Sequence, residues 1–149
     1  MPSLKRRFAA LCFRRRLGRA GQAPACLVAY LPQRQQGWIL DFLWQDLCEQ
    51  LRRRPGPAVG VVATAAELWT RCRGTDLMVL AMSLDALNAL IALGFPPERI
   101  VFYHTHVRLG LPMQKLDLLH AVLVLNGFEA ELIGMRKVPR RRIHRFPAG

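Results

Sequence analysis

Two histidines stand close together after an apolar run, in the segment Tyr103-His104-Thr105-His106. An imidazole can donate a hydrogen bond to a sugar hydroxyl, stabilise a developing charge or move a proton near neutral pH. A histidine inside a core is more often a structural residue. Two histidines at the end of a strand, before a loop that contains Gly110 and Pro112, also fit a binding or catalytic site.

A second position with possible chemistry follows the first apolar run of the chain. Gly37 precedes a helical pattern, so the backbone N–H groups at the start of that helix can meet a phosphate. A lone glycine before a helix is equally typical of a plain turn. Neither the dinucleotide motif G-x-G-x-x-G nor the phosphate-loop motif G-x-x-x-x-G-K-[ST] occurs at this place.

Other kinds of active site lack their patterns. The sequence has no G-x-S-x-G motif for a serine nucleophile. A response-regulator receiver domain needs acidic residues after its first strand, and Leu31-Pro32-Gln33 stands there instead. Asp117, Glu129 and Glu131 are interpreted as solvated helix residues rather than as a carboxylate pair. No metal site and no cofactor are therefore expected.

The elements that must position these residues alternate between short apolar runs and longer helical periodicities. Strands are predicted at 25–31, 59–64, 77–82, 99–105, 121–126 and 142–147. Helices are predicted at 38–53, 65–73, 84–93 and 128–134. The apolar runs are continuous, which is typical of strands buried on both faces. The chain is therefore predicted to be a single α/β domain: a doubly wound, mostly parallel Rossmann-like sheet of about six strands with helices on both faces.

The ends and faces of two helices can also be predicted. Ser83 is expected to cap the helix at 84–93, which Gly94 and Pro96 end. The helix at 38–53 is expected to turn one apolar side to the sheet, formed by Ile39, Leu40, Leu43, Leu47 and Leu51.

The formal net charge of +12 over 149 residues is concentrated at the two ends. Residues 1–22 carry seven basic residues and residues 134–149 carry six, both without an acid, while the body between them is nearly neutral. Such ends favour anionic partners such as lipid headgroups, phosphorylated substrates or nucleic acid. A basic amphipathic helix over 1–22 that binds an anionic membrane and a disordered basic leader are both compatible with this composition.

The cysteines and the apolar stretches favour a cytoplasmic protein. Cys12, Cys26, Cys48 and Cys72 are far apart and lack metal-ligand spacing, so buried reduced thiols are expected. The longest apolar stretch, residues 77–95, contains polar residues and is a poor membrane span. The protein is therefore expected in the cytoplasm, with peripheral attachment at the inner face of the membrane as an option.

The last third of the chain, LDLLHAVLVLNGFEAELIGMRKVPRRRIHRFPAG, resembles a stretch of retaining GT-B glycosyltransferases of the glycogen synthase and phosphatidylinositol mannosyltransferase type. In these enzymes a strand that ends in Ser or Asn is followed by a helix, by a G-V-P pattern and by a final strand that runs into P-x-G. The corresponding pieces here are AVLVLN, GFEAELIG, Val138-Pro139, Arg142-Ile143 and Phe146-Pro147-Ala148-Gly149. VFYHTH resembles the family's fourth strand, and PQRQQGWILDFLWQDL resembles its first loop and helix.

The resemblance implies a function for the predicted edge of the sheet. The chain would be the N-terminal, acceptor-side half of an enzyme that moves a sugar from a nucleotide-sugar donor to an acceptor carbohydrate or lipid. His104 would be the catalytic residue that contacts the transferred sugar. The residues that would bind donor or acceptor are Gln36, Gly37, His106 and Asn126.

The resemblance also implies a division of the chain. Residues 1–22 form the basic extension, and residues 23–149 form the Rossmann-like acceptor-side domain. The donor-binding C-terminal domain of the family, which carries a Glu-x7-Glu pair, is expected to be absent, so the chain should be inactive by itself.

The alternative is a non-enzymatic basic module that binds nucleic acid or anionic surfaces through its arginine-rich ends. These ends lack interleaved aromatic residues and a recognisable reading helix, so specific nucleic-acid recognition is not expected.

Overall fold

A computed structural model describes residues 24–32, 39–53, 55–104, 116–135 and 137–145 of the chain. Their strands are β1 (Cys26–Tyr30), β2 (Ala58–Val62), β3 (Leu77–Ala81), β4 (Ile100–His104), β5 (Ala121–Val124) and β6 (Ile143–Arg145). Their α-helices are α2 (Ile39–Arg52), α3 (Ala65–Gly74), α4 (Leu84–Ala92) and α5 (Gly127–Met135). The short 3-10 helices η2 (Pro97–Arg99), η3 (Leu116–Leu118) and η4 (Arg140–Arg142) precede β4, β5 and β6.

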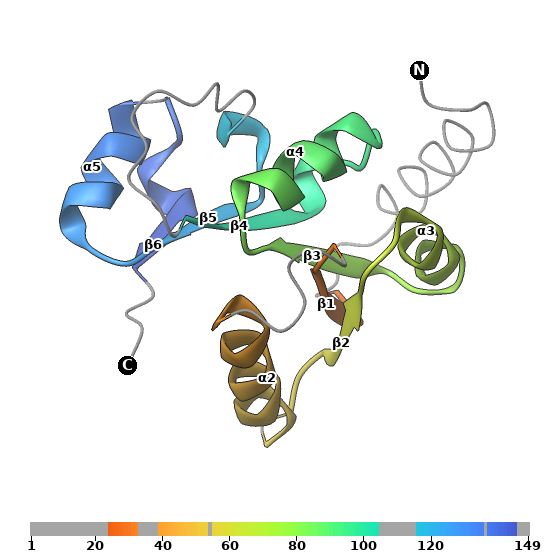
Figure 1. Ribbon diagram of the computed structural model, residues 1–149. Coiled ribbons are helices and arrows are strands. Elements are labelled where there is room, and N and C mark those ends of the chain that lie inside the picture. The colour runs from red at the N-terminus through yellow and green to blue at the C-terminus, as the bar shows by residue number, and fades with distance from the viewer. Residues whose placement is uncertain (1–23, 33–38, 54, 105–115, 136, 146–149) are drawn as a thin grey trace.

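The strands form one parallel sheet in the order β2-β1-β3-β4-β5-β6 (Figure 1). The winding of the chain reverses between β1 and β3, which is where doubly wound folds place their ligand crevice. The predicted α/β Rossmann-like fold is confirmed, and each predicted strand and helix is present with ends that differ by a few residues.

The two faces of the sheet bury separate apolar clusters because side chains of a strand alternate between faces. Cys26, Val28 and Tyr30 of β1 belong to the cluster that also contains residues of α3, α4 and α5. Ala29 and Leu31 belong to the opposite cluster, where α2 contributes Trp44 and Cys48. Among the described helices, α3, α4 and α5 therefore cover one face of the sheet and α2 covers the other (Figure 1).

The face that α2 turns to the sheet contains part of the predicted row and two further residues that the prediction left out. Trp44 is fully buried and Cys48 nearly so, while Leu43 and Leu47 are partly buried beside them. The bulky indole fills the space between the helix and the sheet, and the leucines flank it. The prediction is therefore confirmed for Leu43 and Leu47, whereas the side chains of Ile39 and Leu40 lie outside the described part of the chain.

Local signals at the ends of α4 act as predicted. The Ser83 hydroxyl accepts a hydrogen bond from the Ala86 N–H at 3.1 Å. Gly94 follows the helix with a φ of 74°, a left-handed conformation that glycine adopts at little cost. Burial of the thiols is confirmed for Cys26, Cys48 and Cys72, which are free cysteines, whereas Cys12 lies outside the described residues.

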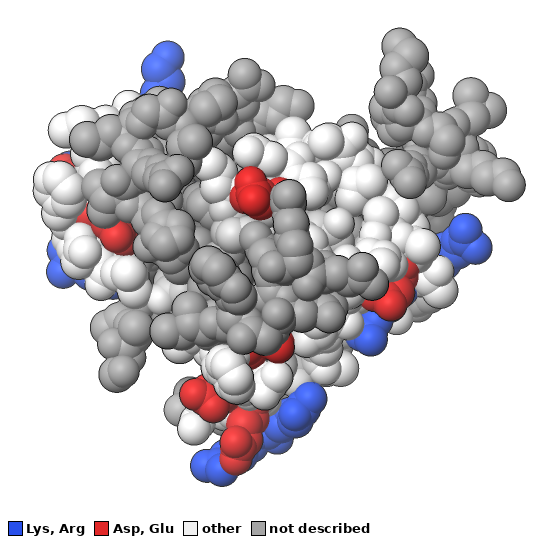
Figure 2. Space-filling model, in the orientation of Figure 1, with Lys and Arg blue, Asp and Glu red and all other residues white. Residues whose placement is uncertain are grey.

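In the described part of the chain, positively and negatively charged side chains lie interspersed on the surface. Figure 2 shows cations at the periphery of the visible face, with acids and bases side by side at the end of α2. One such pair there joins Arg53 to Glu49 across one helical turn. No helix in the described parts of the chain is long and apolar enough to cross a membrane. The basic extension, residues 1–22, lies outside the described residues.

Candidate functional site

The carboxyl ends of the parallel strands lie along one edge of the sheet, and two of the predicted site residues stand there. His104 is the last residue of β4, and Asn126 follows β5 at the start of α5. The register pairs His104 with Val124. The imidazole therefore lies beside the connection from β5 to α5, and this connection contains Asn126.

Glu129 joins these two positions. Its backbone N–H donates to the Asn126 side-chain oxygen at 2.9 Å, and its carboxylate Oε2 accepts from the Leu125 N–H at 2.8 Å. The same Oε2 lies 3.7 Å from Nδ1 of His104. Only 5% of His104 and 2% of Glu129 is exposed, so the pair is shielded from water. In a shielded position the charge of the carboxylate is screened less than at the surface.

Glu129 corrects the sequence interpretation. It was expected to be a solvated helix residue, and that expectation is wrong, whereas Asp117 and Glu131 are exposed as expected. The pattern Asn126-x-x-Glu129 before a helix matches a capping box, in which a carboxylate at the third helical position turns back toward the N-terminus. That signal was present in the sequence and indicates why Glu129 faces the strand ends.

One aromatic ring contacts His104, and a second lies on the opposite face of β4. The Phe102 ring meets the His104 ring edge-on, with centroids 5.9 Å apart and planes at 83°. Tyr103 lies on the other face of β4, where burial raises the pKa of its hydroxyl, and the negative charge of Glu129 raises it further. The influence of Glu129 therefore reaches both faces of β4.

The remaining predicted site residues cannot be compared with the structure. Gln36, Gly37 and His106 lie outside the described residues. Whether Gly37 shares an edge with His104, as expected, stays a prediction. Within the described ranges there is no group of three or more His, Cys, Asp or Glu side chains that could hold a metal ion.

The arrangement supports proton transfer or hydrogen bonding by His104. The Glu129 carboxylate lies beyond hydrogen-bond distance of Nδ1, so it acts on the ring through its negative charge, which favours a proton on that nitrogen. Nε2 is then the nitrogen that accepts a proton or, in the protonated ring, donates a hydrogen bond. Asn126 holds Glu129 through the helix cap and thereby positions the carboxylate.

Comparison of the chain with protein-family models, curated proteins and solved structures gives no match. The function of the edge therefore has to be inferred from its residues, their geometry and the pattern of the sequence.

Proposed function

We propose that this chain is the N-terminal, acceptor-side domain of a retaining glycosyltransferase, which uses a nucleotide-sugar donor. The observation that carries the proposal is the buried pair of His104 and Glu129 at the carboxyl edge of the parallel sheet. Ligands of open parallel sheets bind at this edge. The resemblance of residues 25–149 to the GT-B group supplies the reaction class.

In this proposal His104 contacts the transferred sugar through Nε2. A sugar presents hydroxyl groups, which accept and donate hydrogen bonds, and its transfer develops charge at the anomeric centre. The charge of Glu129, 3.7 Å from Nδ1, favours a proton on that nitrogen and leaves Nε2 to face the sugar. Asn126 is a positioning residue, because it acts through Glu129 rather than through the substrate.

The test uses the full chain and follows the histidine rings by NMR while an acceptor and a donor are added. Maltoheptaose and phosphatidylinositol vesicles serve as acceptor probes, and UDP-glucose and GDP-mannose serve as donor probes. We expect the ring signals of His104 to move with at least one of these probes, because the transferred sugar passes from donor to acceptor beside this residue. We also expect no transfer or hydrolysis of the nucleotide sugars above background.

Variants give the test its controls. His104→Ala should abolish the response, and Glu129→Gln should weaken it by about tenfold, the effect expected of a residue that orients a binding group. The matched control is His144→Ala on the exposed side of β6, which should leave the response unchanged. Clear turnover by the chain alone, or His104 signals that respond to no probe, would contradict the proposal.

A second candidate function is anion binding by the opposite edge of the sheet. His120 lies at the amino end of β5. Partial burial lowers the pKa of its imidazole most, and the nearby positive charges of Arg99, Arg142 and His144 lower it further. Arg140 and Arg141 are exposed next to this group. Arg99 is paired with Asp76 at 3.1 Å, so Arg140 and Arg141 are the cations of this edge that can attract phosphates.

Two binding probes separate the anionic partners. A single-stranded oligonucleotide and phosphatidylserine vesicles are compared at low and high salt, with the full chain and with a form that starts at Gly21. Membrane binding by residues 1–22 predicts that only the vesicles lose affinity in the shortened form. If the double variant Arg140→Ala/Arg141→Ala instead loses affinity for both probes equally, the anions bind at the amino edge of the sheet.

A further inference from the structure

Strand β6 ends the sheet. Its three residues pair with Val122, Leu123 and Val124 of β5, and among the described strands it has no neighbour on its other side. The outer edge of β6 therefore presents N–H and C=O groups that another extended segment can pair with. His144 and Arg145 are exposed along it.

A hollow of about 430 Å³ lies beside this edge, between α5 and the segment that contains β6. Its lining consists of Ala130, Glu131, Gly134, Met135, Val138, Arg140, Ile143 and Arg145. The small residues Ala130 and Gly134 leave the space open, and a Cβ atom added at Gly134 would meet nothing within 4 Å. Val138 and Ile143 give the hollow apolar walls. The volume falls in the range of sites that enclose a side chain or small ligand.

Helix α5 adds exposed apolar surface next to the hollow. Met135 is 77% exposed and Phe128 is 64% exposed. They are seven residues apart and therefore share one side of the helix. Large apolar side chains that gather on an exposed helix indicate a contact surface.

The other edge of the sheet is built differently. At β2 the guanidinium of Arg71 lies over Gly60, so close that an added Cβ would be 2.7 Å from its Nη1. A cation over an edge strand discourages pairing with another chain. The Arg145 guanidinium instead lies over Gly127 at the start of α5, where an added Cβ would be 2.8 Å from its Nη2. Arg145 is thus turned toward α5 and the hollow.

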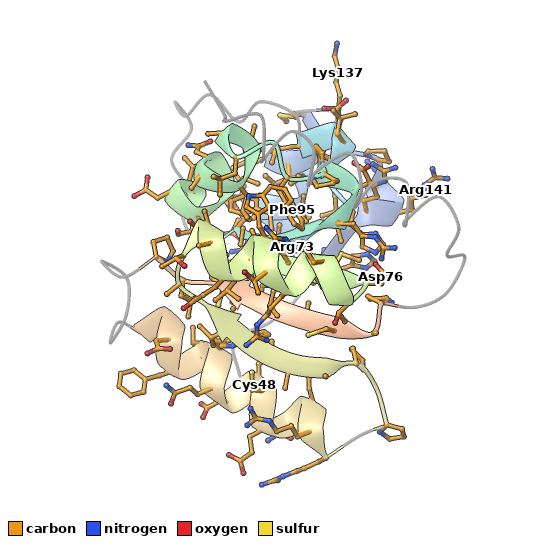
Figure 3. The ribbon with its side chains drawn as sticks, turned by 90° about the vertical axis from the view of Figure 1, so that its right-hand side faces the viewer. Cys48, Arg73, Asp76, Phe95, Lys137 and Arg141 are labelled. Carbon is orange, nitrogen blue, oxygen red and sulfur yellow. The ribbon has the colours of Figure 1, made fainter. Side chains whose placement is uncertain are left out.

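The charges at the β6 edge favour an acidic partner. Arg140 and Arg145 stand at the rim of the hollow together with a single acid, Glu131. Lys137 and Arg141 are exposed in the same segment, and Figure 3 shows Lys137 projecting away from the body of the molecule.

We propose that β6 and this hollow bind an extended acidic segment of a partner protein, which adds a seventh strand to the sheet. Side chains of an added strand that are two residues apart point to the same side. One apolar side chain enters the hollow, and acidic side chains two positions before and after it contact Arg140 and Arg145. Backbone pairing supplies affinity, and the hollow with its arginines supplies selectivity.

The experiment measures the fluorescence anisotropy of a labelled peptide, Ser-Glu-Thr-Leu-Thr-Glu-Ser, with the full chain. We expect binding that weakens about tenfold when both Glu residues are replaced by Lys, because the rim is basic. Replacing the second Thr by Pro should weaken it equally, since Pro removes an N–H that strand pairing needs. Equal binding of the Pro peptide would overturn strand addition, and equal binding of the Lys peptide would overturn the acidic preference.

Protein variants locate the site. Gly134→Leu fills the hollow while keeping a residue that suits a helix, and Arg140→Glu/Arg145→Glu reverses the rim. Each should weaken binding about tenfold or more, as hot-spot changes do. The charge-matched control is Arg52→Glu/Arg53→Glu on the exposed end of α2, which should keep most of the affinity. An equal loss of affinity in the α2 variant would mean that the peptide binds only by non-specific charge attraction, which would overturn the proposal.

A second copy of the chain is the competing occupant of the edge. Sedimentation velocity over a range of protein concentrations measures it directly. Suppose that the chain forms a dimer, that Gly134→Leu dissociates it and that the peptide does not. That result would assign the β6 edge to self-association and contradict the proposal. Absence of any peptide binding at millimolar concentration would also overturn it.

Discussion

Helices α3 and α5 begin with the same local device and put it to different uses. In α3 the Thr64 hydroxyl accepts from the Glu67 N–H at 3.2 Å, and the Glu67 carboxylate accepts from the Ala63 and Thr64 N–H groups at 2.8 and 3.3 Å. In α5 Asn126 and Glu129 repeat the pattern, with Leu125 as donor to the carboxylate. Each carboxylate stabilises the positive end of its helix.

The two devices differ in what surrounds them. Thr64 and Glu67 are exposed, because α3 follows the edge strand β2. Glu129 is buried, because α5 follows β5 and the last residue of its neighbour β4 is His104. At the edge of the sheet the cap only starts a helix. Beside β4 the same kind of cap places its carboxylate next to a buried imidazole. Position in the strand order, rather than local sequence, decides which carboxylate can take part in chemistry.

The largest expected difference is in stability. Glu129→Ala should lower the free energy of unfolding by about 3 kcal/mol, because it leaves a buried imidazole and the Leu125 N–H without the carboxylate. Glu67→Ala should cost about 1 kcal/mol or less, since water replaces the exposed carboxylate. Urea unfolding of the two variants measures both values.

The caps themselves provide the control for this comparison. Asn126→Ala and Thr64→Ala each remove one side-chain acceptor from the N–H at the third helical position, so both should cost about 1 kcal/mol. Costs that are equal for Glu129→Ala and Glu67→Ala would mean that the pair with His104 contributes nothing to stability.

A double-mutant cycle isolates the pair. Combining His104→Leu with Glu129→Gln should reveal a coupling free energy of about 1 to 2 kcal/mol, within the range for contacting buried residues. Combining His104→Leu with Glu67→Gln should give additive effects, because nothing in the described structure joins these positions. Additive behaviour of the first pair would show that the 3.7 Å approach has no energetic consequence.

The smallest expected effect is on the titration of Tyr103. Burial raises the pKa of its hydroxyl, and the charge of Glu129 adds to that increase. Glu129→Gln should therefore lower this pKa, and Glu67→Gln should leave it unchanged. Tyrosinate absorbance measures it in a Tyr30→Phe background, since the chain contains only two tyrosines.

The sign for stability follows from the direction of the shift. A folded-state pKa above the ordinary value means that the unfolded chain loses its phenolic proton first. Stability is therefore fully present below the ordinary tyrosine pKa of about 10 and declines as the pH rises beyond it. With Glu129→Gln the decline should become shallower. A Tyr103 pKa that is unmoved by this change would leave burial as the whole cause.

Much of the fold could be predicted because its signals are local. Continuous apolar runs such as LMVLA mark strands buried on both faces, and β3 is buried along its whole length. Ser83 and Gly94 mark the ends of α4 through groups that act within one helical turn. The face of α2 was predicted only in part. Leu43 and Leu47 pack against the core as expected, but Trp44 was missed, because periodicity does not tell which of several apolar residues points straight at the sheet.

The sequence by itself determined the α/β alternation, the parallel fold class, the position of His104 at a strand end and the capping pattern from Asn126 to Glu129. Each of these depends on neighbours a few residues away along the chain. Only the tertiary structure decided that His104 and Glu129, which are 25 residues apart, form a buried pair. The same is true of the hollow beside β6, whose walls come from a helix and a strand on either side of a turn. Both depend on strand order and register, which set distances between side chains that no local pattern encodes.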